Sequence, residues 1–240
     1  MNTFSITDTG RERNSNQDCV FCEENAIGSF PNLFIVADGM GGHRAGDTAS
    51  RMCVEMVAER IRTTDKKTPV SAFEQAIDVA NRAIYEESGK HIELSGMGTT
   101  MVAATITDDM AVIVNVGDSR LYHMRDSLHQ ITVDHSLVEE MVQSGEIQKD
   151  EMRTHPNKNI ITRALGTDTS VRPDCFEIGV REGDVLLLCS DGLTNMLEDD
   201  RVEKILQEHR GQIEQAGREL IRQANEAGGK DNISVILIQV

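Results

Sequence analysis

Short apolar runs recur along the chain between polar turn residues, and this pattern predicts β-strands. The runs are rich in β-branched residues and bounded by Gly, Asp or Asn. They are LFIVA (33–37), TTMVAATI (99–106), MAVIVNVG (110–117), RLYHM (120–124), CFEIGV (175–180), VLLLCS (185–190) and ISVILIQV (233–240). Because polar residues in TITDDMAV separate the second run from the third, we expect a hairpin turn there.

A second pattern spaces apolar residues three or four positions apart, which predicts helices. Three long stripes follow it: Ala49, Met52, Cys53, Met56 and Ile61; Phe73, Ala76, Ile77, Ala80 and Ile84; and Ile213, Ala216, Leu220 and Ala224. Val202, Ile205 and Leu206 indicate a shorter helix, which we expect to begin at Asp199 and Asp200.

The order of these elements indicates the fold class. The helices come in pairs instead of alternating singly with strands, which argues against a doubly wound parallel sheet. It favours antiparallel sheets covered by helical pairs, an α+β architecture. Residues 134–165 differ, because a short predicted helix in SLVEEMVQSG leads into a polar stretch that ends in THPNKNIITRALG. Such excursions from a core often border active sites.

Length and charge narrow the possible functions. The 240 residues suit one large domain or two small ones, and the chain has no linker, repeat or low-complexity tract. It carries 24 basic and 40 acidic residues, a formal net charge of −16. A surface this acidic repels a phosphate backbone, so we expect no nucleic-acid partner. Solubility is the ordinary reason for the excess acid, and cation binding is the alternative.

Cysteines and apolar segments bear on location. The five cysteines are an odd number at scattered spacings, and we interpret them as reduced thiols of a cytoplasmic protein. The first residues, MNTFSITDTG, lack the basic and apolar regions of a signal peptide. Since no apolar run approaches the roughly 18 residues of a membrane helix, we expect no membrane insertion.

Four aspartates stand at the ends of apolar runs, beside small residues. Asp38 ends LFIVAD, Asp118 ends VIVNVGD, Asp191 ends LLLCSD, and Asp231 precedes ISVILI. Any one alone is most simply a turn residue. Four together suggest a shared site, because strand ends can converge and convergent carboxylates repel one another until cations neutralise them. Oxygen ligands select Mg²⁺ or Mn²⁺ over zinc, and the carbonyl of Gly39 could be a further ligand.

Basic residues near the start of the chain add a second kind of chemistry. In GRERNSNQD, Arg13 precedes Asp18 by five residues. Arginine is well shaped for two-pronged phosphate binding, although a lone arginine near an acid is usually a surface ion pair. An arginine beside a site for hard metal ions therefore suggests phosphate chemistry.

In these motifs the sequence resembles a metal-dependent Ser/Thr phosphatase of the protein phosphatase 2C (PPM) family, in its compact bacterial form. The matching stretches are GRERNSNQD, VADGMGG, GMGTTMVAATI, VNVGDSRLYHMR, TVDHSLVEEMVQSGEI, NIITRALGTD, LLLCSDGLTNMLEDD and GGKDNISVILI, in that order. The resemblance covers essentially the whole chain. It implies a single catalytic domain over residues 1–240, with residues 134–165 as the family's variable flap.

The resemblance also implies the fold and the site. We expect a four-layer αββα sandwich, in which two antiparallel sheets are flanked by helical pairs and two to three Mn²⁺ or Mg²⁺ ions bind at one end. By this resemblance, Asp38 bridges two ions; the Gly39 carbonyl binds one of these ions, and Asp191 and Asp231 complete the site of the other. Asp18 acts through water, and Asp118 serves a third ion with Asp191. Arg13 holds the substrate phosphate.

The implied activity is hydrolysis of phosphoserine and phosphothreonine on proteins by a metal-bridging hydroxide. The expected partners are proteins phosphorylated by a Ser/Thr kinase, and we expect a monomer. The alternative is a catalytically silent homologue that binds phosphoproteins or regulates a partner. Such homologues typically lose metal-binding acids, whereas every acid named above is present in this chain.

Two positions depart from the family pattern. Animal members often carry a histidine, a proposed general acid, directly after the Asp-Gly pair, but this chain has Met40. His43 is the candidate substitute, and water is the alternative proton donor. Gln17 stands where many members carry a second acid beside Asp18, which weakens the negative charge around the metals.

Overall fold

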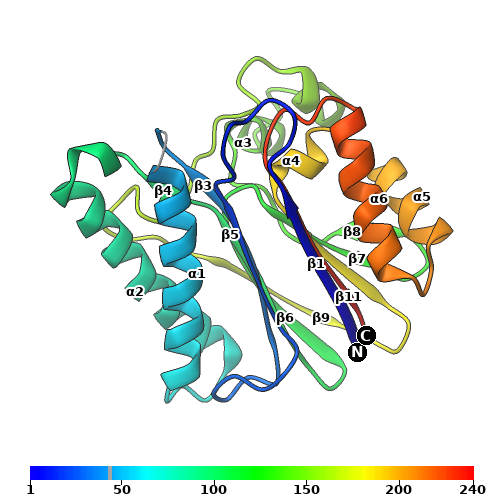
Figure 1. Ribbon diagram of the computed structural model, residues 1–240, viewed down its shortest axis with the longest axis horizontal. Helices are drawn as coiled ribbons and strands as arrows, with labels where there is room; N and C mark the ends of the chain where they lie inside the picture. Colours follow the sequence, from blue (N-terminus) through cyan, green and yellow to red (C-terminus); the bar gives the residue numbers. More distant parts are fainter. Residues whose placement is uncertain (43–44) are drawn as a thin grey trace.

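The computed structural model describes residues 1–42 and 45–240. It consists of four layers, with two sheets packed face to face and a helical pair on the outside of each (Figure 1). Every strand pair in both sheets is antiparallel. The predicted αββα sandwich is therefore confirmed.

Each sheet combines strands from distant parts of the chain. In the first sheet the order is β1 (Asn2–Asp8), β11 (Ile233–Gln239), β10 (Val185–Cys189), β7 (Arg120–Met124) and β8 (Leu128–Gln130). In the second it is β2 (Asp18–Glu23), β3 (Leu33–Met40), β5 (Met101–Thr107), β6 (Met110–Val116) and β9 (Asp174–Gly179), and β4 (Gly98–Thr99) pairs with β3. Both chain termini lie at the edge of the first sheet (Figure 1).

The helices cover the outer faces of the sheets. The long pair α1 (Ala45–Thr63) and α2 (Pro69–Lys90) covers the second sheet, and α5 (Asp199–Glu208) with α6 (Ile213–Glu226) covers the first (Figure 1). The shorter helices are η1 (Ile92–Leu94), α3 (Leu137–Gln143), η2 (Lys149–Thr154) and α4 (Asp191–Thr194). None of the described helices is long and apolar enough to cross a membrane.

Strand β3 shows why the central strands have apolar residues at every position. Phe34 and Val36 point into the core between the two sheets, whereas Leu33, Ile35 and Ala37 face the helices α1 and α2. Successive side chains of a strand point to opposite faces, so a strand with packing on both sides has no polar face. Asp38 is the first charged residue of this strand, and it lies where the layers open into a pocket.

The predicted elements are all present, with corrections at their ends. The strand predicted to stop before Asp38 continues to Met40, because Gly39 and Met40 pair with β4. The strand predicted over 99–106 is interrupted at Thr100, whose hydroxyl accepts a hydrogen bond from the Asp38 N–H at 3.1 Å. The hairpin in TITDDMAV is confirmed, with Asp108 in a left-handed conformation (φ 48°).

The hydrophobic pattern did not predict three strands of the two sheets. β1 and β8 mix polar and apolar residues, and β2 is a short strand that begins and ends with an acid. Each is only partly buried, so its sequence lacks the long apolar run that marks a central strand. Pairing with stronger neighbours, β11, β3 and β7, fixes them in place.

Candidate active site

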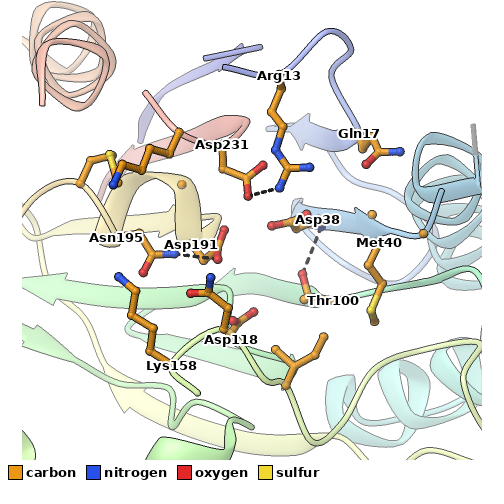
Figure 2. Close-up of a pocket in the computed structure, with 17 residues that line it drawn as sticks. Arg13, Gln17, Asp38, Met40, Thr100, Asp118, Lys158, Asp191, Asn195 and Asp231 are labelled. Carbon is orange, nitrogen blue, oxygen red and sulfur yellow. Dashed lines mark hydrogen bonds and ion pairs between the residues drawn. The ribbon is translucent and has the colours of Figure 1, made fainter. Parts of the chain in front are cut away.

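Most of the predicted site residues line one pocket of about 510 Å³ at the end of the sandwich, whereas Asp18 lies outside its lining. Figure 2 shows four carboxylates in its centre, from four different segments of the chain. The residues around it include Arg13, Gln17, Asp38, Gly39, Met40, Thr100, Asp118, Lys158, Asn159, Ile161, Asp191, Asn195, Met196, Lys230 and Asp231.

The four carboxylates reach the pocket from both sheets. Asp38 belongs to β3, and Asp118 lies in the turn between β6 and β7. Asp191 is the first residue of α4, two positions after the end of β10, and Asp231 lies two positions before the start of β11. The structure thus brings these four carboxylates together at one pocket, whereas their role as metal ligands stays a prediction.

The backbone around Asp38 is fixed by hydrogen bonds across the strand pair. The Asp38 carbonyl accepts hydrogen bonds from the Thr99 hydroxyl and the Thr100 N–H, both at 2.9 Å. The hydroxyls of Thr100 and Ser119 are 2.8 Å apart, which connects this strand to the turn that contains Asp118. A carboxylate on such a fixed backbone has little freedom to relax away from its neighbours.

Gly39 is required by the close packing of its backbone. A Cβ at this position would lie 2.0 Å from the carbonyl oxygen of Gly46 in α1 and 2.7 Å from that of Gln17. Any side chain would therefore push away the start of α1. The structure thus adds a packing reason for the glycine, beside the predicted access of its carbonyl to a metal ion.

Asp18 lies directly opposite Asp38 in the pairing of β2 with β3. Its Oδ2 atom accepts hydrogen bonds from the hydroxyls of Ser190 at 2.8 Å and Ser234 at 2.6 Å. Its Oδ1 atom is buried and has no hydrogen-bond partner among the described residues. One oxygen is thus held in place, and the other is available to a water molecule or an ion.

Asp191 has the same arrangement. Its Oδ2 atom accepts a hydrogen bond from the side-chain amide of Asn195 at 2.8 Å, one turn further along the chain (Figure 2). Its Oδ1 atom is buried, again without a hydrogen-bond partner in the described part of the chain. An unsatisfied buried carboxylate oxygen is costly, and a cation is one means of satisfying it.

Three of the buried carboxyl groups, those of Asp38, Asp18 and Asp191, have raised pKa values. Burial, together with the charges of Asp18 and Asp191, raises the pKa of Asp38 well above its usual range. Burial raises the pKa of Asp18 to about 7, and burial with the charge of Asp231 raises the pKa of Asp191 to about 6. Without cations, the site therefore resists full ionisation near neutral pH.

Burial and the charges of Asp191 and Asp134 likewise raise the pKa of Asp118 well above its usual range. The potential metal ligands around the pocket are therefore carboxylate oxygens that repel one another and are partly without hydrogen bonds. Such oxygens suit hard cations such as Mg²⁺ or Mn²⁺. Within residues 1–42 and 45–240, no three His, Cys, Asp or Glu side chains are grouped so as to hold one ion by themselves. Since Mg²⁺ usually binds one or two carboxylates and keeps several waters, an open site of this kind suits it.

Cationic side chains border the carboxylates. Arg13 donates a hydrogen bond from Nη2 to Asp231 Oδ2 at 2.7 Å, and its side chain is about half exposed. In Figure 2, Arg13 extends toward the carboxylates from above, and Lys158 lies on the opposite side of the pocket with its amine next to Asn195. The guanidinium carries five N–H groups, so the contact with Asp231 leaves donors for a phosphate.

Sequence reasoning missed several residues of this pocket. Thr100 and Asn195 hold the backbone of Asp38 and the carboxylate of Asp191, and Lys158 comes from the 134–165 segment. The only available signal was the prediction that this segment borders an active site. Met40 lines the pocket, as its place after Gly39 suggests, whereas His43 lies outside the described residues.

Comparisons with known proteins agree with this geometry. The sequence model of the family described as protein phosphatase 2C matches residues 10–237. The chain is 43% identical over 238 residues to the serine/threonine phosphatase stp of Listeria monocytogenes, covering 97% of this chain and 93% of that protein.

Solved structures give the same result. The serine/threonine phosphatase of S. agalactiae superimposes with a TM-score of 0.92 at 38% identity, covering 100% of this chain and 99% of that one. The catalytic domain of the phosphatase PstP, solved with two manganese ions, superimposes with a TM-score of 0.85 at 32% identity, covering 98% and 96%.

Fold, site and sequence together define a phosphatase domain of the αββα type. The chain belongs to the protein phosphatase 2C family, and its similarity to bacterial members confirms the predicted bacterial type. The expected enzyme class, protein-serine/threonine phosphatase, is confirmed by the same relatives.

Proposed function

We propose that this protein hydrolyses phosphoserine and phosphothreonine on proteins, with two or three Mn²⁺ or Mg²⁺ ions at the carboxylate pocket. The observation that carries the proposal is the convergence of Asp38, Asp118, Asp191 and Asp231 on one pocket, where burial and neighbouring acids raise the pKa values of the first three. The manganese-bound relative supports the choice of metal.

Each carboxylate has a proposed place. Asp38 is close enough to Asp18, Asp191, Asp118 and Asp231 for their charges to raise its pKa. It would bridge two ions, with the Gly39 carbonyl on one of them and Asp191 and Asp231 on the other. Asp18 would act through water by its free Oδ1 atom. When bound, the ions would lower the pKa of a shared water from its value in bulk solvent towards about 7 and so supply the nucleophile.

Asp118 would serve a third ion together with Asp191. Both residues line a small neighbouring cavity of about 50 Å³ as well as the main pocket. A site with few protein ligands and many waters binds weakly, so we expect the third ion to be the most easily lost.

Arg13 would bind the substrate phosphate. Its contact with Asp231 places the guanidinium at the edge of the carboxylate group, where a phosphoryl group would meet it. Two N–H groups on one side of a guanidinium match two phosphate oxygens, which would orient phosphorus for attack and stabilise the charge that develops on its oxygens.

The leaving serine or threonine oxygen needs a proton, and Met40 cannot supply it because a thioether carries no acidic hydrogen. His43 and water remain the two candidate donors. The expected substrates are proteins phosphorylated by a Ser/Thr kinase, as the names of the relatives suggest. A monomeric state and a cytoplasmic location stay predictions.

The test is phosphate release from a generic aryl phosphate and from a phosphothreonine peptide. We expect turnover with Mn²⁺ or Mg²⁺ and its loss after chelation, with recovery when the metal is restored. Full activity in metal-free buffer would contradict the metal mechanism. Absence of turnover with either metal, in a folded protein that binds the phosphopeptide, would instead support the catalytically silent alternative.

A further inference from the structure

A buried ion pair at the start of β7 has no part in the proposed mechanism. Arg120 donates from Nε to both carboxylate oxygens of Asp134, at 2.9 and 3.0 Å, and from Nη2 to Asp134 Oδ2 at 2.6 Å. The exposed fractions of the two side chains are 20% and 7%. Arg120 lies two residues after Asp118, and both line the small cavity beside the carboxylate pocket.

The ion pair belongs to a larger polar network. Arg120 donates from Nη1 to the Tyr122 hydroxyl at 3.0 Å, and that hydroxyl donates to Asp199 at the start of α5, also at 3.0 Å. Gln130 donates to Asp134 at 2.9 Å from β8. All three guanidinium nitrogens are thus engaged: Nε and Nη2 bind Asp134, and Nη1 binds Tyr122. These contacts fix the orientation of the guanidinium.

Asp134 is the first residue of the 134–165 segment, and the next residue is bound to the turn that contains Asp118. The N–H of Gly117 donates to His135 Nδ1 at 2.9 Å, and the N–H of His135 donates to the Gly117 carbonyl at 3.0 Å. Gly117 directly precedes Asp118. We call Asp134, His135 and Ser136, the first residues of this segment, its root. Through these hydrogen bonds the root and the backbone next to Asp118 are held as one unit.

The same root holds the far end of the segment. The N–H of Thr162 donates to the His135 carbonyl at 2.8 Å, the N–H of Leu137 donates to the Ile160 carbonyl at 2.8 Å, and Ser136 pairs with Ile161. Ile161, with Lys158 and Asn159, forms a wall of the carboxylate pocket. A shift of Asp134 would thus reach this wall through a short chain of hydrogen bonds.

We propose that Arg120 is a positioning residue for the reaction: through Asp134 it sets the root of the 134–165 segment, and with it Asp118 and the pocket wall. This inference rests on the proposed function, and it adds to that function a residue that contacts neither metal nor substrate. The opposing interpretation is that the ion pair only stabilises the fold.

The chain contains a matched control for that interpretation. Arg125 follows the other end of β7 and binds Asp184 with Nε and Nη2, at 2.9 and 2.7 Å. Asp184 is as well buried as Asp134, with side-chain exposures of 2% and 7%. Arg125 and Asp184 are absent from the carboxylate pocket and the small cavity beside it. Loss of either ion pair should cost stability, but only the loss of Arg120 should misplace the site.

The experiment compares Arg120→Met, Arg120→Lys and Arg125→Met with the unsubstituted protein. Each is measured for thermal stability, for kcat and KM with a phosphothreonine peptide, and for Mn²⁺ binding by calorimetry. We expect Arg120→Met to lower kcat/KM by about 10- to 100-fold and to weaken the last Mn²⁺ binding step, as is usual when a supporting residue of a metal site is lost. Arg120→Lys should recover part of both, and Arg125→Met should stay within about twofold of the unsubstituted protein.

Asp134→Asn tests the same ion pair from its other side, because it removes the carboxylate and keeps the arginine. If Arg120 acts through Asp134, the double variant with Arg120→Met should be no worse than the poorer single variant. Additive losses would overturn the proposal, because they would mean that Arg120 acts independently of the segment root. Equal losses of stability in Arg120→Met and Arg125→Met, with kcat/KM and the Mn²⁺ steps unchanged in both, would also overturn it.

The two proposals fail in different ways. If the unsubstituted protein shows no metal-dependent turnover, the proposed function fails, whereas the Mn²⁺ titrations still compare the Arg120 and Arg125 variants. If the unsubstituted protein is active and Arg120→Met equals Arg125→Met, only the positioning role fails.

Discussion

An aspartate lies near each end of strand β10, and the two carboxyl groups differ in their hydrogen bonding. One is surrounded by donors, and the other is only partly satisfied. Asp184, just before the strand, accepts hydrogen bonds from Arg125 and from the Arg181 N–H, and His123 Nε2 lies 2.9 Å away. Asp191, just after it, has one oxygen bound to Asn195 and the other buried without a hydrogen-bond partner among the described residues.

The pKa values of the two aspartates differ accordingly. Burial alone would raise the pKa of Asp184, but hydrogen bonds from Arg125 and His123 outweigh it and lower the pKa to about 2. Burial and the charge of Asp231 raise the pKa of Asp191 to about 6. Satisfied carboxylates stabilise a fold, whereas unsatisfied ones destabilise it until a ligand arrives. Asp184 at one end of β10 therefore contributes to stability, whereas Asp191 at the other end belongs to the proposed active site.

The largest effect is expected at Asp38, which would bridge two ions. Asp38→Asn should lower turnover by more than about 100-fold, because supporting residues of metal sites alone cost 10- to 100-fold. The thermal stability of the metal-free variant should change little, since burial and the neighbouring acids already disfavour the ionised form of Asp38 and Asn is likewise uncharged. Kinetics with Mn²⁺ and thermal unfolding without it check both statements. Retention of more than a tenth of the rate would count against the bridging role.

Arg13→Ala should have the next largest effect, again on function and not on stability. A charge-assisted hydrogen bond contributes about 1.5–3 kcal/mol, so kcat/KM should fall on the order of 10- to 150-fold. Its ion pair with Asp231 is exposed and should contribute little to folding. Steady-state kinetics with a phosphopeptide provide the measurement. Unchanged kcat and KM would leave Arg13 as a surface residue.

Asp184→Asn should show the reverse behaviour, with stability lost and activity kept. Removing this carboxylate should lower the free energy of unfolding by about 1–3 kcal/mol at pH 7. The pKa of Asp184 is lower in the folded than in the unfolded state, so its stabilising contribution is present above pH 4 and disappears as the pH falls towards 2. Denaturant unfolding at pH 7 and pH 3 should therefore show a smaller difference between variant and parent at pH 3.

The last expected effect concerns the pH dependence of the stability of the metal-free protein. Asp191 and Asp18 have folded-state pKa values of about 6 and about 7, above the usual value near 4. The folded state therefore binds more protons than the unfolded state, and stability should fall as the pH rises from 4 towards 7. Each kcal/mol lost lowers the melting temperature by about 2–4 °C.

Mn²⁺ should remove this decline, because ions that bind only the folded state stabilise it and favour the ionised carboxylates. Melting curves between pH 4 and 8, with Mn²⁺ and with chelator, make the comparison. A metal-free protein whose stability rises over that range would show that the carboxylates at this end of β10 do not repel one another.

Much of this protein was predictable from its sequence. The central strands and long helices follow from the spacing of apolar residues, because burial on one or both faces leaves a short-range periodic pattern. Asp38, Asp118, Asp191 and Asp231 were identifiable because each interrupts or borders an apolar run. The resemblance to the protein phosphatase 2C family followed from eight motifs that occur in the family's order.

The tertiary structure alone decided which acids are satisfied. Nothing near Asp184 in the sequence shows that Arg125 binds it, and Asp18 is held by Ser234, which is 216 positions away. The extension of β3 to Met40 depends in the same way on pairing with β4. The hydrophobic pattern is a local property, whereas the state of a carboxylate depends on charges and donors that only folding brings within hydrogen-bonding distance.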